Sequence, residues 1–399
     1  MLRRGALQLC GCHVPVPSQR LAARGERARC FSTTRGLGFV FDIDGVLLRG
    51  ATPLPRARDT LRSLSASRTP FILLTNGGGE LESAKAAKLS KLLHLAIHPL
   101  QVVLSHTPMR PLCASLSAHR VLVLGCRDAI GVARAYGLTH AVSAADLLHD
   151  EPSRYPFIDV PARAPLPNRE APIKAVMVLH DPNSWGLEAQ VAMDVLRGGW
   201  PLGSGRAAAQ AVPMYISNPD LTFAGAYAGA PRLAGGAFSV ALKALWAATH
   251  PAGHCEPLRV EAFGKPTRAT FDFAGLRLRQ WAAWCDANGW HKRVEEGPPT
   301  LSPEEAAAAA AAEAAATEAA GGGGGAGAAA LPAFERIFML GDNPSADIAG
   351  ANAAGGPWRS VLLRTGMWEG GANDATHPAA HVAQGVGEGV AAALAAWGR

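Results

Sequence analysis

Short apolar runs bounded by glycine, proline or polar residues recur along this 399-residue chain and alternate with helical patterns. Each run is brief and rich in branched or aromatic side chains, which predicts a strand buried on both faces. Helical spacing of apolar residues appears at residues 55–65 and 81–95. Strands alternating with helices predict an α/β fold, in which helices cover both faces of a parallel sheet. The four clearest strand candidates are residues 38–41, 71–74, 121–124 and 337–340.

A second α/β block interrupts the first. Within residues 100–257, candidate strands at residues 173–179 and 212–216 again accompany helical patterns. Strand signals that end in polar motifs resume near Phe263, so the first domain is expected to continue there. The length of the chain agrees with two or three domains. We therefore expect a discontinuous first domain at residues 37–99 and 258–399, with a second domain at residues 100–257 inserted into it.

The composition changes abruptly at residues 295–332, where Gly-Pro-Pro precedes a run of alanines with a few glutamates and five consecutive glycines. Alanine and glutamate favour helix, but no apolar stripe is present to dock one, and a glycine run favours a flexible tether. We expect a disordered, inert insertion within the first domain. Because it links a helix to the next strand, it belongs at the amino-terminal edge of the strands, away from their carboxyl ends.

The net charge of +6 is concentrated at the start of the chain. Residues 1–36 hold seven arginines and one acid, Glu26, so the rest of the chain is neutral. A neutral body implies no strong attraction to nucleic acid. An arginine-rich, acid-poor segment is typical of an organelle transit peptide, and Arg29-Cys30-Phe31 before Ser32 resembles a mitochondrial processing site. We expect a mitochondrial location, with plastid and cytoplasm as alternatives.

Two aspartates, Asp42 and Asp44, end the apolar run at residues 38–41. Alternate residues of a strand share a face, and two like charges so close are unfavourable unless a cation or different roles relieve them. Asp42 is a candidate nucleophile, as in enzymes that form an aspartyl phosphate. Asp44 is a candidate acid and base for the leaving oxygen and for water, with Gly45 allowing a turn. A calcium-binding or turn-forming pair is the alternative for this motif alone.

Two more polar motifs occur where such chemistry needs them. Thr75, Asn76 and Gly77 follow the strand at residues 71–74, and glycines there leave backbone N–H groups to hold an anion. Lys265 stands before a helix and provides a cation for a phosphoryl oxygen and for the nucleophile. The sequence therefore indicates an anion site near the first aspartate pair.

A second pair of acids, Asp342 and Asp347, lies at the end of the strand at residues 337–340 and the start of a helix. Carboxylate oxygens in that position are suitable ligands for Mg²⁺. Each later motif is weak by itself, but their order and their placement at strand ends argue against coincidence.

At these residues the chain resembles the haloacid dehalogenase superfamily. The resemblance implies a Rossmann-like core with the active site at the carboxyl ends of the strands, as is usual for open α/β sheets. Dehalogenases lack the second acid of the first motif, so Asp44 implies cleavage of a phosphate ester. The four motifs are matched by Asp42 with Asp44, Thr75, Lys265, and Asp342 with Asp347, and the implied Mg²⁺ ligands are Asp42, Asp44, Asp342 and Asp347.

The long segment between Asn76 and Glu261 resembles the large α/β cap, of the C2 type, of class IIA (NagD-like) members. Finer motifs resemble the cat eye syndrome critical region protein five-like branch. The resemblance implies that Asn76, Gly77, Asn218 and Asp220 bind substrate. From the residues alone, however, Asn218-Pro219-Asp220 is equally well explained as a turn after a strand.

The function implied is a Mg²⁺-dependent phosphatase that hydrolyses a small phosphomonoester through an aspartyl-phosphate intermediate. The alternative is a binding or regulatory protein of the same fold, with little turnover and a link to mitochondrial glycerophospholipid metabolism. The expected partner is a small phosphorylated substrate, and the sequence is compatible with a homo-oligomer. No run of about 18 apolar residues occurs, so no membrane span is expected.

Overall fold

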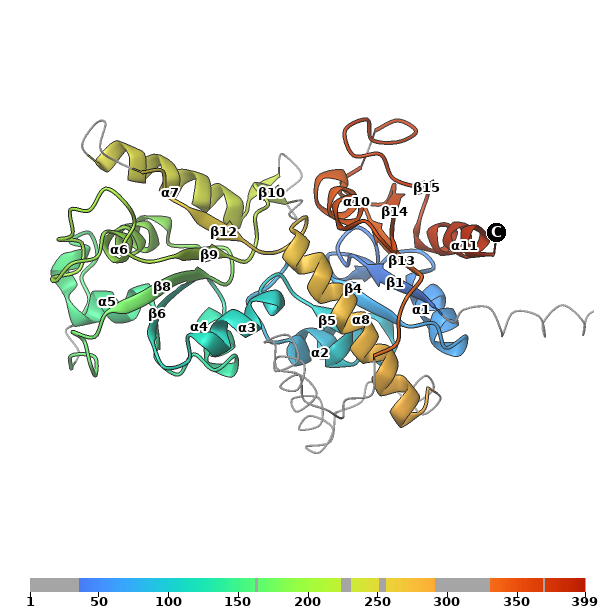
Figure 1. Cartoon of the computed structure of the whole chain (residues 1–399), viewed down its shortest axis with the longest axis horizontal. Helices are drawn as coiled ribbons and strands as arrows, with labels where there is room; N and C mark the ends of the chain where they lie inside the picture. Colours follow the sequence, from blue (N-terminus) through green and yellow to red (C-terminus); the bar gives the residue numbers. More distant parts are fainter. Residues whose placement is uncertain are drawn as a thin grey trace, which may run out of the picture.

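The structure is a computed structural model that describes residues 36–161, 164–223, 231–250, 256–290, 331–368 and 370–398 (Figure 1). The expected leader, apart from Gly36, and the expected insertion, apart from its last two residues, lie outside the described residues. Two parallel sheets organise the described part of the chain, one in each half of the elongated molecule. None of the described helices has the length and apolar character needed to cross a bilayer.

The first sheet has six parallel strands. Its central strand β1 pairs with β13 on one side and with β4 on the other. The strands expected at residues 38–41, 71–74 and 337–340 are confirmed as β1, β4 and β13. In sheet order the strands are β15 (His381–Ala383), β14 (Trp358–Leu363), β13 (Arg336–Gly341), β1 (Leu37–Phe41), β4 (Phe71–Leu74) and β5 (Val102–Val103).

Alternation along β1 directs its side chains into two separate cores. Phe39 and Phe41 belong to the apolar cluster on one face of the sheet, and Val40 belongs to the cluster on the other. Because both faces are covered, every residue of β1 is buried. The first face is covered by α1 (Ala57–Ala66), α2 (Glu82–Leu93) and α11 (Val386–Trp397), and the second by α8 (Arg268–Asn288) and α10 (Ala349–Ala354).

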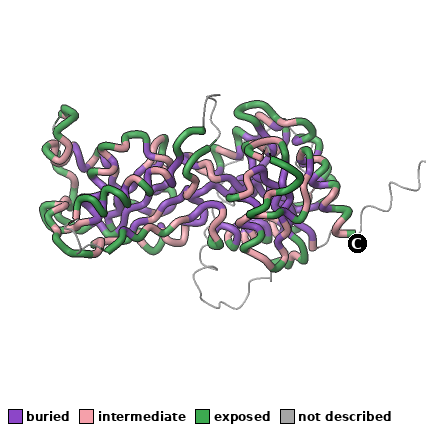
Figure 2. The backbone as a smooth tube through the Cα atoms, turned by 90° about the horizontal axis from the view of Figure 1, so that it is seen from above, coloured by how far each residue is buried: buried purple, intermediate pink, exposed green. Residues whose placement is uncertain are grey.

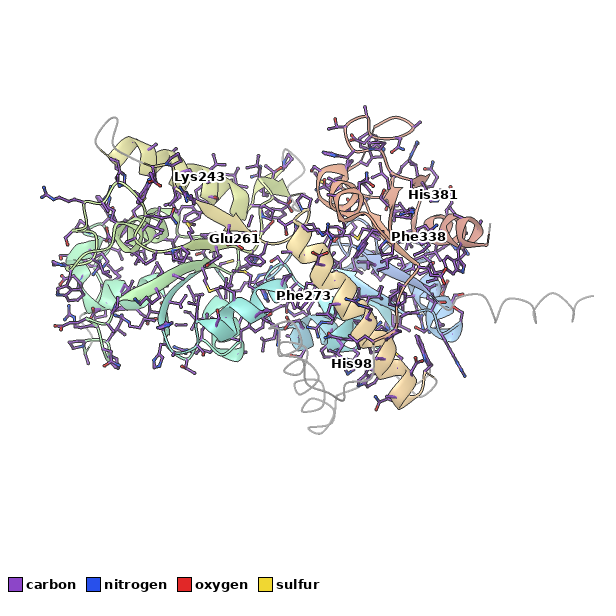
Figure 3. The ribbon with its side chains drawn as sticks, viewed as in Figure 1. His98, Lys243, Glu261, Phe273, Phe338 and His381 are labelled. Carbon is purple, nitrogen blue, oxygen red and sulfur yellow. The ribbon has the colours of Figure 1, made fainter. Side chains whose placement is uncertain are left out.

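Aromatic packing marks where α8 ends. His98 lies against Trp281 and Trp284 in the last turns of α8, with ring centroids 5.5 and 4.6 Å away (Figure 3). His98 precedes β5, so the helix ends at the edge where the strands of the first sheet begin. The described segment that contains α8 therefore ends at the amino-terminal edge of that sheet.

The second sheet has five parallel strands, also covered on both faces. The strands expected at residues 121–124, 173–179 and 212–216 are confirmed within it. In sheet order they are β12 (Val260–Ala262), β9 (Met214–Ile216), β8 (Ile173–Val178), β6 (Arg120–Leu124) and β7 (Ala141–Val142). One face carries α3 (Arg110–Ser115) and α4 (Ala129–Ala135), and the other carries α5 (Ala144–Asp150), α6 (Trp185–Arg197) and α7 (Gly235–Thr249).

Figure 2 shows buried segments running through both halves of the molecule, with exposed residues around them. Smaller elements complete the described chain. Two antiparallel hairpins are formed by β2 (Leu48–Arg49) with β3 (Thr52–Pro53), and by β10 (Thr222–Phe223) with β11 (Arg232–Leu233). Single helical turns are η1 (Pro99–Gln101), η2 (Thr107–Met109), η3 (Pro152–Arg154) and the π-helical η4 (Pro344–Ile348).

The chain crosses between the two sheets near the expected boundaries, but a few residues later at each. β5, at residues 102–103, still pairs with β4 of the first sheet. β12, at residues 260–262, still pairs with β9 of the second sheet. These edge strands are only two and three residues long, so they carry too little apolar pattern to be assigned to a sheet from sequence.

A buried polar cluster joins the two halves at the first crossing. Glu82 of α2 accepts hydrogen bonds from the hydroxyls of Thr107 and Tyr136, at 2.7 and 2.5 Å, and pairs with Arg110 at 3.1 Å. His106 Nδ1 lies 2.8 Å from the Tyr136 hydroxyl. Burial opposes ionisation of Glu82, but the charges of Arg110 and His106 outweigh it and lower its pKa to about 2. The cluster therefore fixes α2 of the first half against α4 of the second.

Candidate active site

Three neighbouring strands deliver acidic or hydroxyl side chains to one edge of the first sheet. Asp42 follows β1, Thr75 follows β4 and Asp342 follows β13, and these strands are adjacent in the order β13-β1-β4. Asp42 N–H extends the ladder by donating to Leu340 O at 2.9 Å, and Thr75 N–H donates to Val103 O at 3.0 Å. The side chains therefore meet at the carboxyl edge, where open α/β sheets bind ligands.

Asp42, Asp342 and Asp347 form a compact group of buried carboxylates. One oxygen from each lies within 4.8 Å of the others. Asp347 is held in η4, where one of its oxygens accepts a hydrogen bond from Asn343 N–H at 3.1 Å. Asp342 accepts a bond from Met367 N–H at 2.5 Å. Asp342 and Asp347 are thus each fixed by a backbone N–H of a loop at this edge.

Lys265 contributes a positive charge directly to this group. Its ammonium lies 2.8 Å from Asp42 and 2.7 Å from Asp347, and its side chain is almost completely buried. Burial alone would lower the pKa of Lys265, but the charges of Asp347 and Asp42 outweigh it and raise the pKa well above its usual value. Lys265 is therefore a permanent cation beside the expected nucleophile.

One ammonium does not balance three carboxylates. Burial, followed by the charges of Asp42 and Asp347, raises the pKa of Asp342 to about 8. Burial also raises the pKa of Asp347 to about 7, against the opposing effect of Lys265. All the ligand atoms are carboxylate oxygens, which are the hard donors that Mg²⁺ prefers. The residues present therefore fit a divalent cation of this kind.

The carboxylate of Asp44, which the family resemblance implied as a metal ligand, does not belong to this group. The reason is local: β1 ends at Phe41, and Gly45 adopts a left-handed φ of 83°, so strand alternation does not extend through Asp44. Asp44 reaches solvent, yet the protein atoms around its carboxylate, followed by the charge of Asp42, raise its pKa. Asp44 therefore lies beside the grouped carboxylates and is open to solvent.

The loop after β4 uses its glycines for close packing. Gly77 N–H donates to the Thr75 hydroxyl at 3.0 Å, so it is not free for an anion as the sequence suggested. A Cβ on Gly78 would come within 2.9 Å of His106 and Ser105, and one on Gly79 would collide with His180. Glycine is required here by the histidines packed behind the loop.

Asn76 connects three segments that are distant in sequence. Its Oδ1 accepts a hydrogen bond from Lys265 N–H at 2.7 Å, and its Nδ2 donates to Lys265 C=O and to the Asp220 carboxylate, both at 2.9 Å. The sequence assigned Asn76 and Asp220 to substrate binding. The structure pairs their side chains with each other across the two halves of the molecule and places Asn76 against the backbone of Lys265.

Asn218, the remaining substrate-binding candidate, forms a turn. Its Oδ1 accepts from Asp220 N–H at 3.0 Å, and its Nδ2 donates to Asp181 at 3.3 Å. Asp181 also accepts from Gly235 N–H at 2.7 Å. In this structure Asn218 makes the contacts expected of a turn after a strand. The turn positions Asp220.

Sequence reasoning gave no role in the site to the loop that follows β14. Gly366 approaches Asp342 so closely that a Cβ would overlap the carboxylate, and Gly45, which packs directly against Gly366, approaches the same carboxylate oxygen. The Thr365 hydroxyl also donates to Gly45 C=O at 2.5 Å, tying this loop to the turn after Asp42. The signal available in the sequence was the pair Thr365-Gly366 after an apolar strand, which also fits an ordinary turn.

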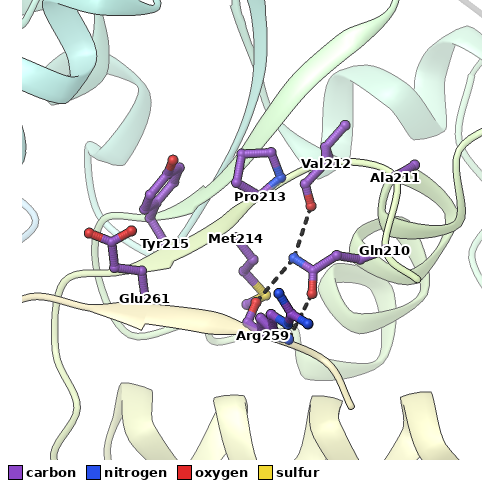
Figure 4. A pocket seen from close by; sticks show the side chains of 8 residues that line it. All are labelled: Gln210, Ala211, Val212, Pro213, Met214, Tyr215, Arg259 and Glu261. Carbon is purple, nitrogen blue, oxygen red and sulfur yellow. Dashed lines mark hydrogen bonds between the residues drawn. The ribbon is translucent and has the colours of Figure 1, made fainter. Parts of the chain in front are cut away.

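A separate hollow of about 330 Å³ lies where β9 and β12 begin (Figure 4). Gln210 spans it, with its amide donating to Val212 C=O and Arg259 C=O and accepting from Arg259 N–H. Asn218 and Lys265 follow the opposite ends of these two strands. The hollow is therefore remote from the carboxylate group, and its central side chain serves to join the strands.

Comparison with known proteins places this geometry in context. The sequence model of a family described as haloacid dehalogenase-like hydrolase matches residues 39–139, and a second, described as HAD-hydrolase-like, matches residues 301–389. A mitochondrial hydrolase of Saccharomyces cerevisiae is 32% identical over 355 residues, spanning 86% of this chain and 91% of that protein.

Two further similarities are informative. A cardiolipin synthase and mitochondrial hydrolase fusion protein of Schizosaccharomyces pombe is 32% identical, spanning 83% of this chain and 49% of the fusion protein. A glycerol phosphate phosphatase of Mycobacterium tuberculosis, solved in complex with magnesium, is 18% identical and has a TM-score of 0.53, covering 89% of this chain and 76% of that one. At 18% identity, the similarity to the Mycobacterium tuberculosis protein shows a shared fold.

Proposed function

Because the chain belongs to the haloacid dehalogenase-like hydrolases of the NagD-like class IIA and is a phosphoric monoester hydrolase, we propose that it hydrolyses a small phosphomonoester through a phosphorylated Asp42, with Mg²⁺ as cofactor. The observation that carries this proposal is the ammonium of Lys265, which bridges Asp42 and Asp347 inside the buried carboxylate group. A fixed cation beside a carboxylate orients it as a nucleophile toward an incoming phosphate.

In the first half of the reaction, an oxygen of Asp42 attacks phosphorus, and the bond from phosphorus to the alcohol oxygen breaks. Asp44 gives its proton to that oxygen, so the alcohol leaves neutral. Its raised pKa suits a proton donor. Lys265 and the Thr75 hydroxyl stand at the same edge of the sheet and stabilise charge on the phosphoryl oxygens.

In the second half, water attacks phosphorus and Asp44 takes its proton. The bond from Asp42 to phosphorus breaks, phosphate leaves, and the carboxylate of Asp42 is restored. Asp44 thus serves as acid and then as base, which its accessibility to solvent supports.

Asp42, Asp342 and Asp347 would hold the Mg²⁺ ion. When bound, Mg²⁺ supplies positive charge that reduces the repulsion between the carboxylates and an incoming phosphate. The close approach of Gly45 and Gly366 to Asp342 supports a carboxylate held in a fixed orientation, as a metal ligand needs.

The test is hydrolysis of a panel of phosphomonoesters, with glycerol phosphate included, in the presence of Mg²⁺ and after its removal by a chelator. We expect phosphate release that requires Mg²⁺ and that disappears in Asp42→Asn, because an amide is not a nucleophile. The matched control is Asp272→Asn, which changes an exposed aspartate of α8 that pairs with Arg268. Full activity of a pure Asp42→Asn sample would refute the mechanism.

We also propose a mitochondrial location, supported by the arginine-rich residues 1–36 and by the two fungal relatives, both named as mitochondrial hydrolases. Sequencing the amino terminus of the protein isolated from its source should find a mature chain that starts near Ser32. A mature chain that still begins at Met1 would contradict this.

A further inference from the structure

The hairpin formed by β10 and β11 exposes large apolar side chains. Leu221, Phe223 and Leu233 are 57%, 45% and 62% exposed, although they fall within or directly beside strands of two residues each. Single exposed apolar residues are common, but a concentration of them on one small element is typical of a contact surface. The hairpin therefore needs an explanation beyond ordinary surface composition.

The base of this hairpin is joined to the reaction centre. Leu221 directly follows Asp220, whose carboxylate accepts from Asn76 at 2.9 Å and is close enough to Lys265 and Asp42 for their charges to act on its pKa. Ala234 N–H donates to Leu221 C=O at 3.0 Å and closes the base. In Figure 1 the hairpin stands at the end of the second half that faces the first.

A fourth exposed apolar side chain lies on the other side of the site. Met367 donates its backbone N–H to Asp342, one of the three grouped carboxylates, and the residue is 41% exposed. The described hairpin strands contain no acidic residue, and their single charge is Arg232. Exposed apolar side chains thus lie on both halves of the molecule. On each half they are next in sequence to, or hydrogen-bonded to, a residue at the proposed phosphate site.

We propose that these side chains bind the alcohol part of the substrate, and that the substrate is the phosphate monoester of an alcohol with a straight apolar chain. This rests on the proposed function, since the phosphate must be held at Asp42. A polyhydroxylated leaving group placed here would lose water from its hydroxyls without replacing those hydrogen bonds. An alkyl chain would instead cover Leu221, Phe223 and Met367 and be stabilised by leaving water. The reaction is the same hydrolysis, giving the alcohol and phosphate.

The experiment measures kcat/KM for n-alkyl phosphates from methyl to octyl, all below their micelle concentrations, with glycerol phosphate as the polar reference. Complete burial of one methylene corresponds to roughly a fourfold gain in binding. For a surface open on one side we expect about twofold per methylene, so octyl phosphate should exceed methyl phosphate by about 100-fold.

The variants Phe223→Ser and Leu221→Ser should reduce the ratio of kcat/KM for octyl phosphate to that for glycerol phosphate by at least about tenfold, because each removes apolar contact area. The matched control is Leu245→Ser, at 44% exposure on α7, which should retain the wild-type ratio. Unchanged unfolding midpoints show that the variants fold, and Met367→Ser tests the opposite side of the site.

The outcomes separate the two claims. If no ester is hydrolysed, both the proposed function and this inference fail. If short esters are hydrolysed but kcat/KM does not rise with chain length, the inference alone is wrong. It is also wrong if light scattering shows a dimer that Phe223→Ser converts to a monomer, because the hairpin would then be covered by a second copy of this chain.

Discussion

Replacing Asn76 with alanine tests how the second half of the molecule is coupled to Lys265. The side chain makes three hydrogen bonds, two to the backbone of Lys265 and one to the Asp220 carboxylate. Each is worth about 1 kcal/mol net, and the bond to a carboxylate somewhat more. Asn76 is only partly buried, so water replaces some of them. We expect Asn76→Ala to lower the free energy of unfolding by about 2–4 kcal/mol.

The effect on activity should come through Lys265, which Asn76 positions. Losing the two bonds that hold the Lys265 backbone corresponds to about 2 kcal/mol, or roughly 30-fold in kcat. KM for the substrate should change less, because Asn76 already uses its amide within the protein. Steady-state kinetics with saturating Mg²⁺ and denaturant unfolding measure the two effects separately.

The control is Asn288→Ala, which removes one exposed bond to Trp284 C=O at the end of α8 and should leave kcat unchanged. A double-mutant cycle with Asp220→Ala should give a coupling energy of about 1–2 kcal/mol in stability, since each variant removes the same contact. A kcat within twofold of wild type for folded Asn76→Ala, or additive effects in the cycle, would refute the coupling.

Other expectations concern a buried acid, a close glycine contact and the proton donor. The folded pKa of Glu82, about 2, lies below its unfolded value, so its charge stabilises the fold above pH ~4.3 and this is lost as the pH falls toward 2. The difference in unfolding free energy between wild type and Glu82→Gln should therefore be on the order of 3 kcal/mol at neutral pH and shrink on acidification, and a difference that grows would contradict this. Gly366→Ala should weaken activation by Mg²⁺ at least about tenfold in a Mg²⁺ titration, because a Cβ would displace Asp342. The control Gly371→Ala has open space around it and should leave the titration unchanged. Asp44→Asn should form the phosphoenzyme and then stall, which intact mass after acid quench detects, and a free enzyme with normal turnover would count against its role.

Much of the first sheet could be predicted because its strands are local signals. The runs that became β1, β4 and β13 are apolar, bounded by polar motifs and buried on both faces, so pattern alone located them and the groups at their ends. The prediction that Asp42, Asp342 and Lys265 converge followed from their positions at the carboxyl ends of strands. The structure brings these three side chains together.

What could not be predicted depends on contacts between distant segments. Nothing local indicates that Asn76 pairs with Asp220, 144 residues away, or that Met367 donates to Asp342. The carboxylate of Asp44 lies outside the group formed by Asp42, Asp342 and Asp347, because the chain turns at Gly45 and strand alternation ends before it. The glycines after Thr75 looked like an anion loop, but the histidines behind them come from other parts of the chain.

Lys265 lies on the segment that returns from the second sheet to the first, so the second half of the molecule cannot be exchanged without regard to this segment. The chain leaves β12 of the second sheet, passes Gly264 and Lys265, and enters α8 of the first. A Cβ on Gly264 would collide with Ser217 C=O. The returning segment therefore packs closely against the second half of the molecule as well as against Asn76. A replacement for the second half, taken from another protein, would have to preserve the packing of Gly264 against Ser217 and Asn76. A graft that folds well but shifts the crossing would carry a complete set of side chains and still misplace the ammonium, so swaps should be designed with the junction at the start of α8 kept native.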